Sequence, residues 1–192
     1  MPGRSLLVQA LWFFCGQPLC RSALIPSSGF RRWLLKSFGA SIGKGAVLKP
    51  GVRVKYPWRL KVGDFSWLGE DCWIDNIADV WIGSNVCISQ GAYLCTGNHD
   101  WSDPSFGLTA KPIIVEDGAW VGACAFIGPG VRMESHSVAA AASVITGALP
   151  AYSIWRGNPA VWIKRRVIAD RNESPAAVPA GSTLRTRSEE GR

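Results

Sequence analysis

His99 is the residue whose type and setting most clearly indicate chemistry. It is one of two histidines in the 192-residue chain, and it stands in the stretch Thr96-Gly97-Asn98-His99-Asp100. A histidine titrates near neutral pH, so it can take the proton from a hydroxyl group as that group attacks a carbonyl carbon. His99 is also the second residue of the segment 98–114, which interrupts the repeat described below, and excursions from a rigid scaffold commonly carry binding residues. These features make His99 a candidate general base.

A six-residue repeat must position this histidine. In residues 115–150 the first position of every hexad is aliphatic and the fifth is small or compact. A period of six fits neither a helix nor a simple strand alternation, but it fits one short strand and one corner per hexad. The same register runs upstream to Ile42, with two-residue slips at 60–61 and 80–81. Three hexads make one triangular coil, so residues 42–150 predict about five coils.

The hexads resemble those of the hexapeptide-repeat acyltransferases, whose fold is a left-handed parallel β-helix. The stretch 96–100 and the closing Gly157-Asn158-Pro159-Ala160 are similar to the maltose and galactoside O-acetyltransferases. The segment 80–106, with Cys95-Thr-Gly-Asn-His-Asp-Trp-Ser-Asp-Pro, more closely resembles the colanic acid biosynthesis acetyltransferases of exopolysaccharide gene clusters. The expected fold is mainly β: a left-handed parallel β-helix of about five triangular coils, with an N-terminal helical cap and a short C-terminal helix.

The resemblance implies an acetyl-CoA-dependent O-acetyltransferase that acts on a sugar hydroxyl in exopolysaccharide or cell-surface polysaccharide biosynthesis. It implies direct transfer with His99 as general base, no metal cofactor, and a homotrimer that binds acetyl-CoA in a groove between neighbouring prisms. The acceptor-side candidates are Asn76 and its competitor Asp75, which could instead make a turn at their corner, and Asp100, which could orient the ring of His99. The donor-side candidates implied by the family are Trp120, Ala123, Ala141, Thr146, Arg156, Lys164 and Arg165, together with Arg166.

The donor side departs from some relatives of this family. They have Ser at the position of Ala123 and Lys after the position of Thr146, whereas this chain has Gly147 there. Because alanine has no polar side chain, only the main-chain N–H of Ala123 could stabilise a developing oxyanion.

Three other functions compete with this hypothesis. An N-acyltransferase acting on an amino sugar could use the same base to deprotonate an ammonium group. A zinc hydratase of the gamma carbonic anhydrase type shares the prism, but catalytic zinc needs three protein ligands and the chain has only His99 and His136 as histidines. A non-catalytic scaffold would use the prism for assembly alone and would not bind CoA.

The N-terminal segment 1–41 differs from the repeat in charge and pattern. Residues 1–61 carry eleven Lys or Arg and no acidic residue. This charge fits a solvated face, or attraction to an anionic membrane surface; nucleic acid is not an expected partner, because the prism offers no groove-reading element. Residues 4–15 and 30–38 predict two helices with a linker at 16–29. We expect them to cap the first coil, with a basic, amphipathic membrane foot as the alternative.

The C-terminal part and the cysteines complete the sequence predictions. Residues 151–171 predict a turn and a short basic helix from Val161 to Ala169, and residues 172–192 predict a disordered tail. The six cysteines form no CxxC pair, which fits a reducing compartment. The expected location is cytoplasmic, with the inner face of the membrane as the site of any peripheral contact.

Overall fold

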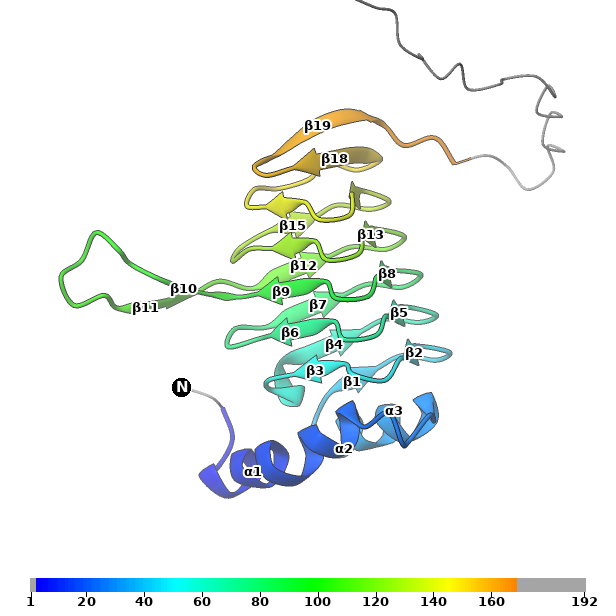
Figure 1. Ribbon diagram of the computed structural model, residues 1–192, viewed down its shortest axis with the longest axis vertical. Coiled ribbons are helices and arrows are strands. Elements are labelled where there is room, and N and C mark those ends of the chain that lie inside the picture. Colours follow the sequence, from blue (N-terminus) through cyan, green and yellow to red (C-terminus); the bar gives the residue numbers. More distant parts are fainter. Residues whose placement is uncertain (1–2, 169–192) are drawn as a thin grey trace, which may run out of the picture.

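The hexads fold into three parallel sheets that form the sides of a triangular prism (Figure 1). The structure, a computed structural model, describes residues 3–168. Sheet A contains β1 (Ser41–Ile42), β4 (Leu60–Val62), β7 (Val80–Ile82), β12 (Ile113–Val115) and β15 (Arg132–Met133). Sheet B contains β2 (Val47–Leu48), β5 (Trp67–Leu68), β8 (Cys87–Ile88), β13 (Trp120–Val121), β16 (Val138–Ala139), β18 (Ser153–Gly157) and β19 (Ala160–Arg165). Sheet C contains β3 (Arg53–Val54), β6 (Trp73–Asp75), β9 (Tyr93–Cys95), β14 (Phe126–Ile127) and β17 (Val144–Ile145).

The first position of each hexad points into the prism, as predicted. Leu68 pairs with Ile88 in the next coil of sheet B, and Ile74 pairs with Leu94 in sheet C, so like positions stack directly along the axis. All four of these side chains are fully buried. Burial of one such side chain stabilises a fold by about 1.5–3 kcal/mol, and the stacked columns repeat this contribution in every coil.

The corners between strands explain the small residues of the repeat. At one corner column the chain takes a positive φ in successive coils, for example +54° at Phe65, +55° at Asn85 and +67° at Gly118. A side chain at Gly118 would also meet the ring of the next coil, because its Cβ would lie 2.6 Å from Nε2 of His136. Bulky residues such as Phe65 are nevertheless accepted in this exposed column, and the compact residues of the repeat are the next ones along the chain, such as Ser66 and Ala119, which are buried inside the corner.

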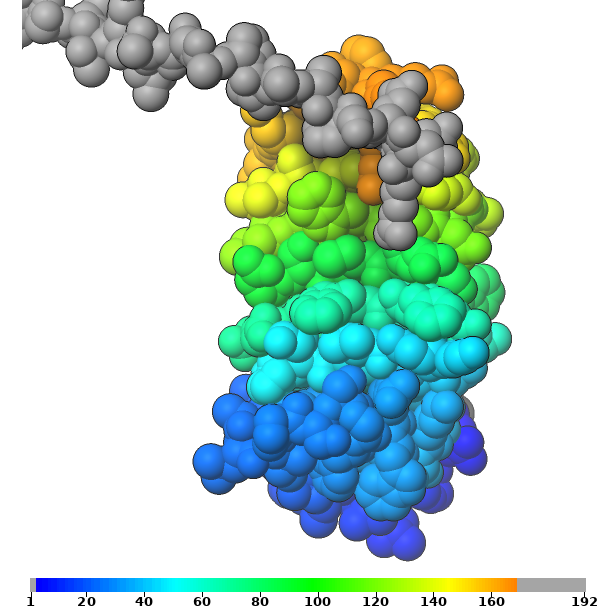
Figure 2. Space-filling model, turned by 90° about the vertical axis from the view of Figure 1, so that its right-hand side faces the viewer, coloured from blue at the N-terminus to red at the C-terminus, as the bar shows by residue number. Residues whose placement is uncertain are grey.

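Five complete coils are present, as predicted, and a sixth is partly formed. Leu149 bridges to Met133 beside sheet A, and β18 adds to sheet B beyond β16. Figure 2 shows the coils as successive colour bands above the N-terminal helices. The two-residue slips predicted at 60–61 and 80–81 lie in the three-residue strands β4 and β7.

A helical foot of residues 6–37 closes the first coil. It consists of α1 (Leu6–Leu11), a π-helical turn (Trp12–Gly16), α2 (Gln17–Arg21) and α3 (Ser28–Ser37). Trp12 is buried against the prism and donates from Nε1 to the carbonyl oxygen of Val54 at 3.0 Å. The predicted cap and both predicted helices are confirmed, but the predicted linker at 16–29 is wrong for residues 16–21, which continue the first helix because Cys20 is buried with Trp12.

The buried guanidinium of Arg31 fastens the parts of the foot to one another. It donates to four carbonyl oxygens, those of Cys20, Ser22, Ile25 and Ser27, at distances between 2.5 and 3.2 Å. A buried charge of this kind is tolerated because its donors are satisfied. The Arg31 side chain has no exposed surface, although arginine is usually found on the polar side of a helix.

The predicted C-terminal helix at 161–169 is wrong. Residues Ala160–Arg165 form β19, which turns back antiparallel on β18 after the cis peptide Asn158–Pro159. One edge of β18 pairs with β16. The other edge would expose unpaired N–H and C=O groups, and β19 pairs with it instead of forming a helix. The predicted tail at 172–192 lies outside the described residues.

The foot should stabilise the prism through Trp12. We expect Trp12→Ala to lower the free energy of unfolding by about 3–5 kcal/mol, because it leaves a cavity under the first coil. Phe14→Ala is the matched control: that ring is 72% exposed, so its loss should change stability by no more than about 0.5 kcal/mol. Thermal and denaturant unfolding of both variants measures the difference, and equal effects would contradict the capping role.

Candidate active site

The segment 98–114 folds as an arm that leaves the prism between β9 and β12. Its two strands, β10 (Gly97–His99) and β11 (Leu108–Ala110), pair antiparallel, with His99 opposite Leu108. Figure 1 shows the arm extending sideways from the corner between sheets C and A. The sequence predicted the interruption of the repeat here, and the structure shows that the interruption is a hairpin.

The imidazole of His99 is held in one orientation by Phe106. The two rings stack with centroids 4.7 Å apart and planes 9° apart, and Nδ1 lies 2.8 Å from the carbonyl oxygen of Phe106. A carbonyl oxygen only accepts hydrogen bonds, so Nδ1 carries the proton in the neutral ring and Nε2 has a free lone pair. This tautomer is the one a general base needs when Nε2 faces its substrate.

Asp100, the sequence candidate for orienting this ring, has another partner. Its carboxylate accepts from both the main-chain N–H and the hydroxyl of Ser102, at 3.0 and 2.5 Å. The hydrogen bond from the Ser102 hydroxyl is the main reason that the pKa of Asp100 lies below its usual value. Asp100 therefore shapes the tip of the arm, and the main-chain carbonyl of Phe106 takes the orienting role. A backbone atom leaves no signal in the sequence that could have revealed this.

A cleft of about 480 Å³ lies on sheet B and at the corner that leads to sheet C. Four of the donor-side candidates line it: Trp120, Ala123, Ala141 and Arg166. Trp120 is fixed by a hydrogen bond from Nε1 to the hydroxyl of Ser89 at 2.9 Å. Ser89 and Gln90, which also line the cleft, were not among the candidates from sequence.

The main chain at this corner offers hydrogen-bond donors. At the corner between sheets A and B, side chains of the next coil cap the corresponding N–H groups, as Asp64 does for Lys44 and Asp117 does for Ser84, each at 2.7 Å. Within residues 3–168, the N–H groups of Ala123 and Ala141 have no such acceptor. Unpaired donors in a cleft favour a ligand that carries carbonyl or amide oxygens.

The basic candidates divide into two groups. Arg166 lines the cleft and donates from Nη1 to the carbonyl oxygens of Gly118 and His136, at 2.9 and 3.1 Å. Arg156, Lys164 and Arg165 are exposed on β18 and β19, beyond the last complete coil. The structure therefore brings Arg166 to Trp120 and Ala123, and it leaves the other three around the end of the prism.

Thr146 lies apart from the cleft. It follows β17 at the corner between sheets C and A, whereas Ala123 and Ala141 occupy the corner between sheets B and C. Thr146 thus shares its corner column with the root of the arm. In one protomer the arm and the cleft are separated by the width of sheet C.

The two acceptor-side candidates on β6 and after it have structural partners. Asn76 is buried, and its side chain bonds to both the N–H and the carbonyl of Tyr56 in the coil below, at 2.9 and 2.7 Å. An amide engaged in this way holds the coils together and cannot reach an acceptor outside the prism. Asp75 lies next to Cys95 at the root of the arm and pairs with Lys55 at 2.9 Å and with the hydroxyl of Tyr93 at 3.3 Å.

The described part of the chain contains no group of three His, Cys, Asp or Glu side chains placed to hold a metal ion. His136, the second histidine, sits at a corner of the fifth coil and stacks on Tyr152, with ring centroids 4.7 Å apart. No helix within residues 3–168 has the length and apolar character to cross a membrane.

Comparison with known proteins shows the family to which this chain belongs. No protein-family model matches the chain. The colanic acid biosynthesis acetyltransferase WcaF of Escherichia coli is 41% identical over 138 residues, which is 72% of this chain and 76% of that protein. This chain belongs to the hexapeptide-repeat acetyltransferase family.

Solved structures of this family have the same fold. A maltose O-acetyltransferase from Clostridium difficile superposes with a TM-score of 0.76 at 24% identity, covering 85% of this chain and 90% of that one. A hexapeptide-repeat acetyltransferase from Vibrio cholerae, solved with acetyl-CoA, gives a TM-score of 0.74 at 21% identity over 84% of this chain and 88% of its own. These likenesses confirm the predicted left-handed β-helix.

The cysteines differ in burial, and burial determines how readily their thiols react. Burial raises the pKa of Cys20 to about 11 and that of Cys72 to about 12, so both stay protonated near neutral pH. The thiolate is the reactive form, and Cys15 and Cys124 are exposed. We expect iodoacetamide at about pH 8 to label Cys15 and Cys124 in the native protein and to leave the two buried thiols unmodified until unfolding. Mass spectrometry of the labelled peptides checks this, and native labelling of Cys72 would contradict the buried position.

Proposed function

We propose that this chain transfers an acetyl group from acetyl-CoA directly to a sugar hydroxyl, in the biosynthesis of an exopolysaccharide or other cell-surface polysaccharide. The observation that carries the proposal is the orientation of His99, whose Nδ1–H faces the Phe106 carbonyl and whose Nε2 remains available. The polysaccharide context comes from the similarity to WcaF. Acetyl-CoA as donor is supported by the related enzyme solved with that ligand.

In this mechanism Nε2 of His99 accepts the proton of the acceptor hydroxyl as its oxygen attacks the thioester carbonyl. The carbonyl oxygen gains negative charge, and in this proposal the main-chain N–H of Ala123 donates a hydrogen bond to it. When the tetrahedral intermediate collapses, the C–S bond breaks and the thiolate of CoA leaves. It takes the proton from Nε2 of His99, which returns the base to its neutral form. The enzyme needs no nucleophile of its own, because holding both substrates in line lowers the barrier.

Two further residues are assigned to substrate binding and take no part in the proton or acetyl transfer. Arg166 is held between Gly118 and His136 at the rim of the cleft, where its remaining guanidinium donors could bind the pantetheine or a phosphate of CoA. Asp75, partly neutralised by Lys55, is the acceptor-side candidate that remains at the surface. We leave Asn76 out of the acceptor site because its amide is buried.

We further propose that the active enzyme is a homotrimer. The arm that carries His99 and the cleft beside Ala123 lie at different corners of one protomer, so one protomer alone does not bring base and donor together. Closed threefold symmetry would place the arm of one prism beside the cleft of the next. The same packing would add Thr146, which shares the arm's corner, to a neighbour's donor site.

The general-base role predicts a selective loss in turnover. We expect His99→Ala to reduce kcat by about 10² to 10⁴, the usual contribution of a general base, with little change in the Kd for CoA. Asp100→Asn should stay within about tenfold of the parent enzyme, because Ser102 can still bond to its side chain. Steady-state kinetics with a sugar acceptor and calorimetric titration with CoA measure the two effects.

Cys95 provides the control for direct transfer. Its Sγ lies at the root of the arm and contacts the carbonyl oxygen of Gly97 at 3.4 Å. Cys95→Ala should therefore keep most of the turnover. An acetyl adduct on the protein in the absence of acceptor, or the loss of activity in Cys95→Ala, would show that transfer is not direct.

Assembly can be measured without an activity assay. Light scattering should give a mass about three times the 20.8 kDa of the chain. A monomer that retains full turnover would contradict the shared site, because base and donor cleft would then have to meet within one prism.

A further inference from the structure

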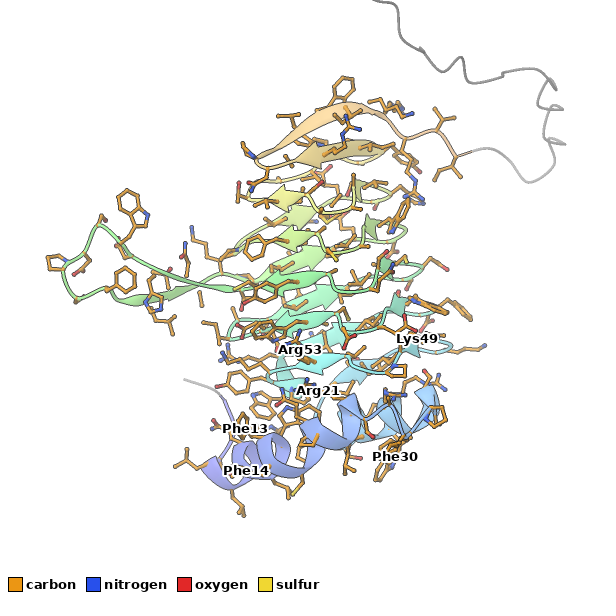
Figure 3. All side chains as sticks on the ribbon, viewed as in Figure 1. Phe13, Phe14, Arg21, Phe30, Lys49 and Arg53 are labelled. Atoms are coloured by element: carbon orange, nitrogen blue, oxygen red, sulfur yellow. The ribbon has the colours of Figure 1, made fainter. Side chains whose placement is uncertain are left out.

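The helical foot has an outer face that its capping role does not explain. Trp12 and Cys20 point toward the prism and are buried, whereas Leu6, Leu7 and Phe14 are 82%, 79% and 72% exposed. A helix that only caps a repeat array presents a polar face to water. In Figure 3 the labelled Phe14 lies farther from the prism than Phe13, Arg21 and Arg53. The foot is therefore apolar on both sides, which indicates a second binding surface.

Charge identifies the partner of this surface. Arg21 and Lys36 are exposed on the foot, Arg4 is exposed just before it, and the first acidic residue of the whole chain is Asp64. Two feet packed against each other would bring these cations together, so the charge opposes a second copy of the chain. Exposed leucine and phenylalanine side chains flanked by arginine and lysine fit the interface of a bilayer that carries anionic lipids.

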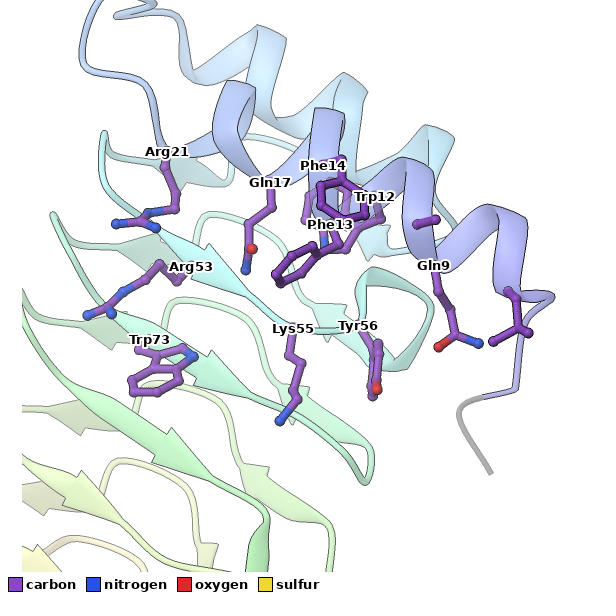
Figure 4. A pocket seen from close by; sticks show the side chains of 12 residues that line it. Gln9, Trp12, Phe13, Phe14, Gln17, Arg21, Arg53, Lys55, Tyr56 and Trp73 are labelled. Carbon is purple, nitrogen blue, oxygen red and sulfur yellow. The ribbon is translucent and has the colours of Figure 1, made fainter.

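A cleft of about 720 Å³ between the foot and sheet C has the same two-sided chemistry (Figure 4). Phe13 and Phe14 belong to its helical wall, and Arg53 and Lys55 come from the prism. Arg21 extends from the end of α2 beside Arg53. The cleft thus has an apolar wall beside a row of cations. The wall suits the upper acyl chain of a phospholipid, and the cations suit its phosphate head group.

The guanidinium groups of this cleft have donors to spare. Lys55 is neutralised by Asp75 at 2.9 Å. Arg53 lies over the ring of Trp73, 4.7 Å from its centroid, and this contact leaves its N–H groups open. The side chain of Arg21 makes no hydrogen bond or ion pair with any residue between 3 and 168. Arg21 and Arg53 are therefore the groups placed to bind a lipid phosphate.

We propose that the foot docks this protein on an anionic phospholipid bilayer. Leu7 and Phe14 enter the interfacial layer, and Arg21 and Arg53 bind phosphate groups at the mouth of the cleft. The foot lies across the N-terminal end of the prism, so docking sets the coils above the membrane surface (Figure 1). The prism face of the foot and its outer face carry separate functions, and neither depends on the proposed acetyl transfer.

The test is sedimentation of the full-length protein with vesicles. The protein should bind vesicles of equal parts phosphatidylcholine and phosphatidylglycerol, and should bind pure phosphatidylcholine at least about tenfold more weakly. Raising the salt to about 0.5 M should reduce binding, because the Debye length shortens. Binding to both vesicles alike, or to neither, would overturn the proposal.

Two double variants test which residues form the docking surface. Leu7→Glu with Phe14→Glu should weaken vesicle binding by at least about tenfold, and Arg21→Gln with Arg53→Gln should weaken it on anionic vesicles. The control is Val167→Glu, which alters a side chain that is 86% exposed beyond β19 and should leave binding unchanged. Equal binding by all three proteins, or self-association of the parent that the Leu7/Phe14 variant abolishes, would refute docking on a bilayer.

A second measurement separates this proposal from the proposed activity. Each variant is also tested for its melting temperature and for CoA binding by calorimetry, neither of which requires vesicles. We expect both to match the parent, because the altered side chains do not touch the cleft on sheet B. A protein that binds vesicles but not CoA would overturn the proposed function alone, and one that binds CoA but not vesicles would overturn the docking proposal alone.

Discussion

Direct stacking of inward-facing aliphatic side chains along the prism axis is the constraint on which the rest of the structure depends. Parallel pairing places Leu68 against Ile88, and Ile74 against Leu94, so each coil buries the side chains of its neighbours. A wider side chain would separate the coils and break the hydrogen bonds between them, whereas a polar one would lack a partner. Regular stacking leaves the corners as the places where the chain can vary, and the candidate site occupies those corners.

The candidate site combines a rigid wall with one projecting arm. At the corner of Ala123 the side chains of the next coil do not cap the main chain, and this leaves donors for a ligand. The arm begins at another corner, where stacking with Phe106 and the Phe106 carbonyl fix the ring of His99. Placing base and donor cleft on separate corners makes assembly part of the proposed chemistry, since neighbouring prisms would bring the two together.

The foot illustrates how one helix can meet two demands. Its inner side closes the exposed end of the first coil through Trp12, which bonds to the carbonyl of Val54. Its outer side carries Leu7 and Phe14 into solvent, although folding does not require apolar residues there. Cations cluster at this end of the prism and again on β18 and β19 at the other end, whereas most acidic residues lie in the coils between them.

The sequence by itself determined the coils and the interruption at 98–114, because a six-residue period restricts which side chains point inward. The motifs at 96–100 and 157–160 indicated the family through their resemblance to known members. It did not determine the strand β19, since a short apolar and basic run suits a helix or a strand until an open sheet edge is present. It also could not reveal that Asn76 is enclosed or that the Phe106 carbonyl orients His99. These depend on atoms brought together from different coils or across a hairpin, and on backbone groups that every residue shares, so only the tertiary structure decided them.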